Sequence, residues 1–148
     1  ITLDLVLSEP DRLSANELVR ALPNHEALQP LVAAIAKQPS NDERLAAAFR
    51  RAPVVIGVVG DSSGTQKLPP PRASFSFAGD DPSASVNSFI GGVTNLPLLS
   101  TAATGIGAVN WLPSQDQILR RVPLLIGISG KVYPSLALEA LRVGSAQS

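Results

Sequence analysis

The chain contains neither cysteine nor methionine, and it has a single histidine and few aromatic residues. The absence of cysteine excludes disulfide bonds, thiolate zinc sites and cysteine nucleophiles. It does not decide the cellular compartment, because a domain with a large enough core is stable without disulfides. The 148 residues begin at Ile1 without an initiator methionine, so we expect residues 1–148 to be one domain cut from a longer protein.

Charge is sparse and balanced, and long hydrophobic runs are missing. Lysine and arginine together number 12, and aspartate and glutamate also number 12. The basic residues are scattered, whereas a nucleic-acid-binding surface needs them clustered, so we expect no nucleic-acid partner. The longest apolar run, residues 52–60, is far shorter than the roughly 20 residues of a membrane-spanning helix. Hydrophobic residues nevertheless make up 45% of the chain, which favours a packed globular fold.

Four segments have the patterns of β-strands. Residues 1–8 alternate between apolar and polar side chains, and residues 53–59 form a continuous apolar run typical of a central strand. Residues 105–112 and 121–128 are also strand-like, and the turn-forming residues 113–117 between them favour a hairpin. The first two strands should form a parallel centre, and the C-terminal segments an antiparallel pair.

Helices are predicted between and after these strands. Ser14 with Glu17, and Ser40 with Glu43, have the spacing of capping boxes, which mark helix starts. Further helices are expected over residues 28–35, 97–103 and 135–143, the last with Leu136, Ala140, Leu141 and Val143 available for burial. The whole pattern predicts a single α/β domain whose mixed, mostly parallel sheet is flanked by helices.

The middle of the chain, residues 60–95, has the weakest secondary-structure pattern. It contains three consecutive prolines at residues 69–71, and it also contains Phe75, Phe77 and Phe89, which should fix this long connection to the core. A connection of this length in a compact domain is often functional.

Two parts of the chain resemble the CHASE type-2 family. The first is an opening strand with an acidic exit, residues 4–12 (DLVLSEPDR). The second combines several anchors in the C-terminal third: Gly107-Ala108-Val109-Asn110, Pro113, Asp116, Arg120-Arg121-Val122-Pro123-Leu124 and Tyr133-Pro134-Ser135-Leu136-Ala137. The family typically has a glycine before its basic pair, where this chain has Gln117, so the geometry of that turn should differ.

The resemblance implies a role in signalling. CHASE type-2 domains are sensing domains outside the membrane on bacterial cyclases and histidine kinases. They usually follow one membrane segment and precede three transmembrane helices and an output domain. The resemblance therefore implies an extracytoplasmic (periplasmic or extracellular) sensor of a receptor in the bacterial inner membrane, controlling a nucleotide cyclase, a diguanylate cyclase or a protein kinase. The expected partner is a small molecule or another envelope protein, and a homodimer is possible.

Polar residues of the C-terminal third form the best candidate ligand site. Asn110, Asp116, Arg120 and Arg121 lie close in sequence, and an arginine can hold a carboxylate or phosphate through two parallel hydrogen bonds. The alternative is a structural pair between Asp116 and one of the arginines that fixes the turn. In a strand the two arginines would point to opposite faces, so at most one of them should face a given pocket.

Glu9 and Asp11 are the second candidate group for ligand binding. They follow the first strand, at an edge where α/β sheets commonly bind ligands. The alternative is that they cap the next helix or pair with Arg12.

No catalytic, metal or cofactor site is expected. The chain has neither a G-x-S-x-G nucleophile motif nor a phosphate-binding loop motif. His25 has no partners at a metal-ligand spacing, and Asp61, Asp80 and Asp81 lack the spacing of a calcium loop. Two alternatives stay open: a structural dimerisation module, and a secreted enzyme in which a serine would have to lie beside His25. A polar groove would favour sensing, and a large flat apolar face would favour assembly.

Overall fold

The computed structural model describes residues 1–20, 28–64, 66–76, 78–79, 85–111, 116, 119 and 121–145. In chain order the elements are β1 (Thr2–Leu3), α1 (Ala15–Arg20), α2 (Gln29–Ala36), α3 (Asn41–Phe49), β2 (Val55–Asp61), β3 (Ser88–Phe89), β4 (Gly91–Val93), α4 (Pro97–Ala102), β5 (Gly105–Ala108), β6 (Leu125–Ile128), β7 (Lys131–Pro134) and α5 (Leu136–Gly144).

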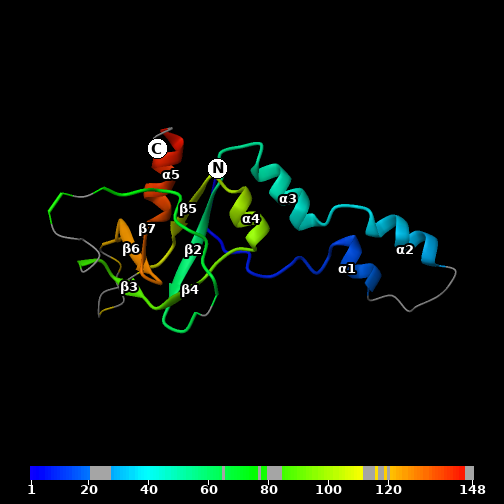
Figure 1. Cartoon of the computed structure of the whole chain (residues 1–148), viewed down its shortest axis with the longest axis horizontal. Helices are drawn as coiled ribbons and strands as arrows, with labels where there is room; N and C mark the ends of the chain where they lie inside the picture. Colours follow the sequence, from blue (N-terminus) through cyan, green and yellow to red (C-terminus); the bar gives the residue numbers. More distant parts are fainter. Residues whose placement is uncertain are drawn as a thin grey trace.

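A parallel sheet of β1, β2 and β5 forms the centre of the molecule (Figure 1). Val55 of β2 pairs with Thr2 of β1 on one side and with Gly105 of β5 on the other. The far end of β2 also pairs with β4, in antiparallel orientation. Because β2 has neighbours on both sides and helices over both faces, residues 54–58 are all buried, which explains their continuous apolar run.

The second sheet consists of β3, β6 and β7. β3 pairs in parallel with β6, and β6 and β7 form an antiparallel hairpin around Ser129 and Gly130, which both have positive φ. A single parallel bridge between Ala108 and Ser135 joins β5 to the residue that follows β7. Only Ile90 separates β3 from β4. The two sheets are therefore connected at two places: by this bridge, and by the chain between β3 and β4.

Helices cover both faces of the parallel sheet. α5 packs against the face that carries Gly105 and Gly107. The residues between them point the other way, so Ile106 belongs to a buried cluster with Phe49 of α3 and Leu99 of α4. α3 and α4 lie side by side over this second face (Figure 1). The main core therefore lies between the parallel sheet and the α3–α4 pair.

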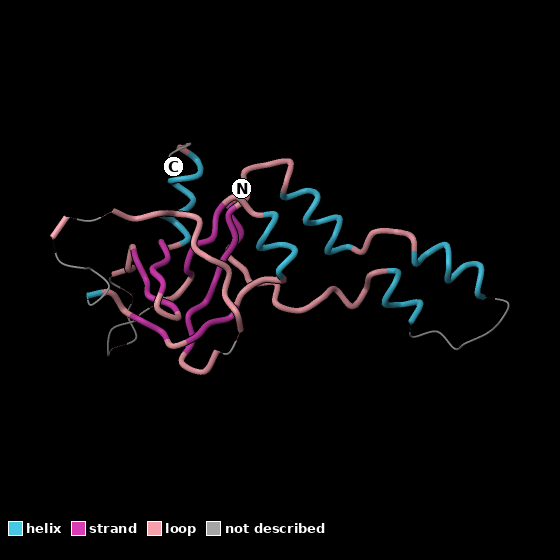
Figure 2. Tube along the Cα trace, in the orientation of Figure 1, coloured by secondary structure: helices cyan, strands magenta, loops and turns pink. Residues whose placement is uncertain are grey.

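α1 and α2 form an arm that projects away from the two sheets (Figure 2). The two helices contact each other, and none of their described residues is buried. Leu18 and Leu31 are each 53% exposed. The helix predicted over residues 28–35 is confirmed as α2, but its apolar face is only partly covered.

One of the two predicted capping boxes is confirmed. The Ser40 hydroxyl accepts a hydrogen bond from the Glu43 N–H, and the Glu43 carboxylate accepts one from the Ser40 N–H. The box predicted for Ser14 and Glu17 is wrong, because the Ser14 hydroxyl accepts from the Asn41 N–H instead. That N–H belongs to the first turn of α3, where backbone donors have no partner within the helix.

The predicted α/β class is confirmed, with β1 and β2 as neighbours in a parallel centre. The hairpin predicted between residues 105–112 and 121–128 is wrong. Residues 105–108 pair with β2 instead, where Gly105 and Gly107 allow α5 to pack closely. The antiparallel partner of β6 is β7, so the C-terminal antiparallel pair exists with one different member.

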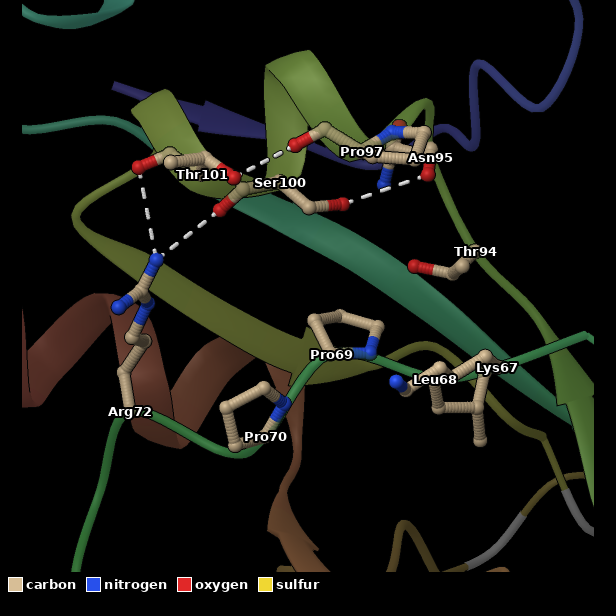
Figure 3. A pocket seen from close by; sticks show the side chains of 10 residues that line it. All are labelled: Lys67, Leu68, Pro69, Pro70, Arg72, Thr94, Asn95, Pro97, Ser100 and Thr101. Atoms are coloured by element: carbon tan, nitrogen blue, oxygen red, sulfur yellow. Dashed lines mark hydrogen bonds between the residues drawn. The ribbon is translucent and has the colours of Figure 1, made fainter.

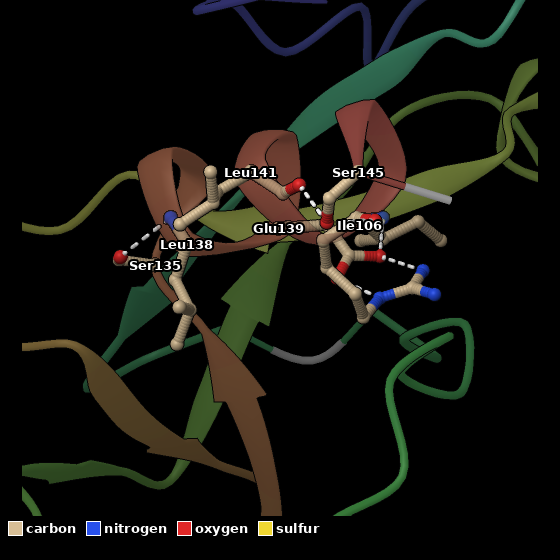
Figure 4. A network of polar contacts seen from close by, with 7 residues as sticks. Ile106, Ser135, Leu138, Glu139, Leu141 and Ser145 are labelled. Atoms are coloured by element: carbon tan, nitrogen blue, oxygen red, sulfur yellow. Dashed lines mark hydrogen bonds and ion pairs between the residues drawn. The ribbon is translucent and has the colours of Figure 1, made fainter. Parts of the chain in front are cut away.

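The helix predicted over residues 135–143 is confirmed as α5, which begins after Ser135. The Ser135 hydroxyl caps its first turn by accepting a hydrogen bond from the Leu138 N–H. The predicted burial pattern is wrong at two positions: Leu141 is 67% exposed, whereas Glu139 is fully buried. The Glu139 carboxylate accepts hydrogen bonds from the Ile106 N–H at 3.2 Å and from two Arg142 nitrogens at 2.8 Å each (Figure 4). A charged side chain therefore fastens α5 to β5.

Candidate functional site

Asn110 lies just beyond β5, where its side chain extends the pairing with β2. Its Oδ1 accepts a hydrogen bond from the Gly60 N–H at 2.7 Å, and its Nδ2 donates to the Gly60 carbonyl at 2.8 Å. The amide thus reproduces the two hydrogen bonds that a strand residue would make. A ligand that used the Asn110 amide would have to displace Gly60.

The other predicted residues of the C-terminal third are not gathered into one pocket among the described residues. Asp116 is exposed in a turn, and Arg121 is exposed beyond it. Arg120 lies outside the described residues. Asn110 lines a depression together with the exposed Trp111, and neither Asp116 nor Arg121 contributes to that lining. Ligand binding by this group stays a prediction.

Glu9 and Asp11 hold the loop that precedes α1. Glu9 pairs with Arg12 at 2.7 Å on the surface. Asp11 accepts hydrogen bonds from the Leu13 N–H at 3.0 Å and from the Asn41 side-chain amide at 2.6 Å. The hydrogen bond from Leu13, and after it the one from Asn41, hold the pKa of the Asp11 carboxyl below its ordinary value. Both residues thus make the structural contacts that were the alternative to ligand binding.

Residues 66–73 form an extended segment next to α4, which we call the proline strap (Figure 3). Its three consecutive prolines have stiff backbones and no backbone N–H groups. The strap can therefore cross the surface without secondary structure and without unpaired backbone donors at those positions. Leu68 and Ala73 are each 8% exposed and fix its two ends to the core.

Three hydrogen bonds tie the strap to the neighbouring chain. The Gln66 Oε1 accepts from the Thr94 N–H at 2.9 Å. The Arg72 Nη2 donates to the Ser100 carbonyl at 3.2 Å and to the Thr101 carbonyl at 3.5 Å. These carbonyls belong to the last turn of α4, where the carbonyl oxygens carry partial negative charge and have no N–H donors within the helix. Arg72 therefore latches the strap to α4.

A fourth hydrogen bond ties the strap to β7 and should make the stability of the fold depend on alkaline pH. The Tyr133 hydroxyl, fully buried in β7, donates to the Pro69 carbonyl at 2.5 Å. Burial raises the pKa of Tyr133 above its ordinary value. Above about pH 10 the unfolded chain releases this proton first, so stability should fall from there up to the folded pKa. Tyr133→Phe should cost about 1 kcal/mol at neutral pH and abolish this part of the alkaline loss, as measured by urea unfolding.

Few other groups of the chain titrate in the pH range of that measurement. Tyr133 is the only tyrosine, and there is no cysteine to titrate in the same range. If Tyr133→Phe lost as much stability at alkaline pH as the unchanged protein, the loss could not be assigned to Tyr133, and deprotonation of the lysines would be its cause.

Between the strap and α4 lies a pocket of about 330 Å³, which we call the strap pocket (Figure 3). Its volume is at the lower end of the range for small-molecule sites, about 300–1,000 Å³. The strap contributes mainly apolar side chains, and the opposite wall contributes several polar ones. The lining residues are Lys67, Leu68, Pro69, Pro70, Arg72, Thr94, Asn95, Pro97, Ser100 and Thr101.

Two polar groups of the strap pocket have no partner among the described residues. Thr94 is 8% exposed, and its hydroxyl oxygen is buried without a hydrogen bond. In Figure 3 this oxygen points toward the space between the strap and α4. The exposed Lys67 ammonium also makes no hydrogen bond or ion pair with a described residue. A buried unpaired hydroxyl costs about 1–3 kcal/mol, so a bound polar atom is expected beside Thr94.

A second depression, at the base of the arm, is a weaker candidate. Asn16 contributes a buried unpaired oxygen there. The charged groups around it already have partners: Glu17 pairs with Arg20, Glu43 closes the capping box of α3, and Asp11 accepts several hydrogen bonds. A ligand would have to break these contacts, whereas the strap pocket offers unused ones.

A comparison with models of protein families identifies the family of this chain. The sequence profile of the CHASE2 domain matches residues 1–148. The chain belongs to the CHASE2 family. No curated protein and no solved structure matches it significantly. The predicted resemblance is thus confirmed over the whole length and not only over the two segments that suggested it. CHASE2 domains are extracytoplasmic sensing modules of signalling proteins, and they are not themselves catalytic.

Metal ligation finds no support in the described part of this CHASE2 domain. No three histidine, cysteine, aspartate or glutamate side chains lie close enough there to hold an ion. His25, Asp80 and Asp81 lie outside the described residues. None of the helices in the described ranges is both long and apolar enough to cross a bilayer.

The residues that line the strap pocket of this CHASE2 domain were missed by the sequence reasoning. A local signal existed in residues 67–72 (KLPPPR), where two basic residues bracket a stiff apolar segment. Thr94 carries no comparable signal. It lies far from Arg72 in sequence, and its unpaired hydroxyl follows from tertiary packing alone.

Proposed function

We propose that this CHASE2 domain senses a small molecule in the strap pocket and controls a cytoplasmic output domain through membrane segments attached at its two ends. One observation carries the proposal: a wall of the pocket, α4, is connected by hydrogen bonds to the N-terminal residue and by packing at Gly105 to the last turns of α5. A ligand that binds one arrangement of this wall better than another shifts the population toward it by that difference in affinity.

The N-terminal end meets the wall through β2. Thr101 of α4 lines the pocket, and a few residues later the N–H groups of Thr104 and Gly105 donate to the Val54 carbonyl at 2.8 and 3.1 Å. The N–H of the residue after Val54 donates to the Ile1 carbonyl at 2.8 Å. A displacement of α4 would therefore act on the N-terminal residue through two steps of backbone hydrogen bonding.

The C-terminal end meets the same point through α5. A Cβ atom at Gly105 would lie 2.7 Å from the Glu139 Oε1 and 3.0 Å from the Val143 Cγ2, so the last turns of α5 pack directly on it. In Figure 1 the N-terminus and the end of α5 accordingly lie on the same, upper side of the two sheets. Membrane segments before and after a CHASE2 domain would both leave from this side, and a shift of α5 against β1 would move one relative to the other.

Spin labels at Thr2→Cys and Leu141→Cys should report this movement. Both positions are exposed, and the chain has no native cysteine, so labelling is specific. We expect that a compound that binds the folded domain changes the distance between the labels by about 1–2 Å, the usual size of a helix shift. Binders would first be found by their rise in melting temperature, in a panel of osmolytes, sugars, amino acids, carboxylates, phosphates and divalent ions.

A label pair at Thr2→Cys and Arg51→Cys is the matched control. Thr2 pairs with Val55 of β2, and Arg51 lies in the turn just before β2, so their distance should stay constant. A flat thermal response to the whole panel, or a binder that leaves the Thr2–Leu141 distance unchanged, would contradict the proposal. In that case, a dimer in sedimentation equilibrium would favour the alternative of an assembly module, which the exposed Leu18 and Leu31 of the arm support.

A further inference from the structure

We infer that the strap pocket binds a small organic acid, with a carboxylate group and an apolar body. The inference rests on the proposed function for its biological role and goes beyond it in naming the class of ligand. Three independent features of the pocket point to this chemistry: its charge, its walls and its buried hydroxyl.

The charge of the pocket has one sign. Its lining contains two cationic side chains, Lys67 and Arg72, and no aspartate or glutamate. The whole chain has no net charge, so this is a local concentration of positive charge. Arg72 uses Nη2 to hold α4, which leaves the Nε and Nη1 hydrogens of its five donors for a ligand. A carboxylate is a preferred partner of both side chains.

The walls favour a ligand that also has an apolar part. Leu68, Pro69, Pro70 and Pro97 line the pocket with hydrocarbon surface. An aliphatic or aromatic group would gain free energy by displacing water from these side chains, in proportion to the apolar area removed from water. Sugars and inorganic phosphate lack such a group and would leave these walls unused. The volume of about 330 Å³ limits the ligand to a small molecule.

The Thr94 hydroxyl gives the pocket a buried hydrogen-bond donor. Its backbone N–H is already paired with Gln66, but its side-chain oxygen has no partner. A carboxylate oxygen accepts hydrogen bonds from hydroxyl groups, and a charged acceptor makes the stronger bond. With an acid bound, the only unpaired buried group of this pocket's described lining would be satisfied.

Calorimetric titration of the intact chain tests the inference. The probes are hexanoate and benzoate, each compared with its uncharged amide. We expect saturable binding of at least one acid, and binding of the matching amide at least about tenfold weaker. Thr94→Val should weaken acid binding about tenfold and at the same time raise the melting temperature of the free protein, because it removes the unpaired hydroxyl. A residue that only stabilised the fold would not separate these two readouts.

Lys67→Gln should weaken acid binding by a similar factor and reduce its dependence on salt, because screening acts on the lost charge. Lys37→Gln is the matched control, since Lys37 is an exposed lysine on the arm and is not part of the pocket. It should leave binding unchanged.

The outcomes separate this inference from the proposed function. Amides that bind as tightly as acids, acid affinities unchanged in both Thr94→Val and Lys67→Gln, or a lower melting temperature in Thr94→Val would overturn the inference. If no acid binds at millimolar concentration but another compound changes the Thr2–Leu141 label distance, sensing stands and the ligand class is wrong. If acids bind through Thr94 without changing that distance, the ligand class stands and signal transmission through α5 fails.

Discussion

Replacing Glu139 with alanine should lower the free energy of unfolding by about 3 kcal/mol, although an acidic residue on a helix is usually replaced at little cost. Glu139 is 0% exposed, and its carboxylate is the acceptor for the Ile106 N–H and for two nitrogens of Arg142. The alanine variant would leave the Ile106 N–H buried without a partner. It would also remove the carboxylate that pairs with the Arg142 guanidinium at 2.8 Å.

Urea unfolding of two further variants tests this explanation. Glu17 pairs with Arg20 at the same sequence spacing, but its side chain is 40% exposed, so Glu17→Ala should cost less than about 0.5 kcal/mol. Replacing both Glu139 and Arg142 with leucine should recover the part of the loss that comes from the Arg142 charge, whereas the part that comes from the Ile106 N–H should remain, because leucine offers that N–H no acceptor. A cost for Glu139→Ala no larger than that for Glu17→Ala would contradict the assigned role.

Local signals in the sequence predicted the elements whose limits depend on neighbouring residues. The Ser40 and Glu43 pair starts α3 because both hydrogen bonds of the box lie within four residues of chain. Pro97 starts α4 because its missing N–H would have no partner in the first turn. The apolar run over residues 53–59 predicted a buried strand because a central parallel strand is covered on both faces.

Features that depend on distant partners escaped the sequence reasoning. The pattern of residues 105–108 fits a strand but does not say whether the strand pairs with β2 or with β6. Glu139 has the sequence pattern of a solvent-exposed residue, and its burial depends on an N–H group that β5 presents to it. The same cause explains Ser14, whose hydroxyl caps α3 although Glu17 is closer in sequence.

The residues of the candidate site likewise differ in how far the sequence predicts them. Asn110 was identified as an important polar residue, but its amide pairs with the backbone of Gly60, a partner far away in sequence. The strap pocket depends on Arg72 reaching the last carbonyls of α4 and on Thr94 lying beneath the strap. The spacing of apolar residues along the sequence does not predict such tertiary contacts. The length of the middle connection, which contains the three prolines, predicts a functional role for it, and the experiments on the strap pocket test that prediction.

Gly107→Ala should be a second strongly destabilising change, because no side chain fits between β5 and the start of α5. A Cβ atom at this position would lie 2.6 Å from the Leu136 Cα, 2.9 Å from the Leu136 N and 3.0 Å from the Ser135 carbonyl oxygen. All three are backbone atoms, so the clash cannot be relieved by a rotamer change. We expect a loss of about 3 kcal/mol, and with it a fall in melting temperature of about 10 °C.

Two other glycines turn this expectation into an ordered series for thermal unfolding. At Gly105 the nearest atoms belong to the side chains of Glu139 and Val143. Val143 can shift but Glu139 is held by its hydrogen bonds, so Gly105→Ala should also be destabilising, though less than the clash with backbone atoms in Gly107→Ala. At Gly144, the last residue of α5, nothing lies within 4 Å, and alanine should be neutral or stabilise the helix by up to about 1 kcal/mol. The order follows from what a Cβ atom would meet: backbone atoms at Gly107, side-chain atoms at Gly105 and nothing at Gly144. Equal stability of all three variants would mean that α5 does not pack on β5 at this distance, and the proposed link between the strap pocket and the C-terminal end would fail with it.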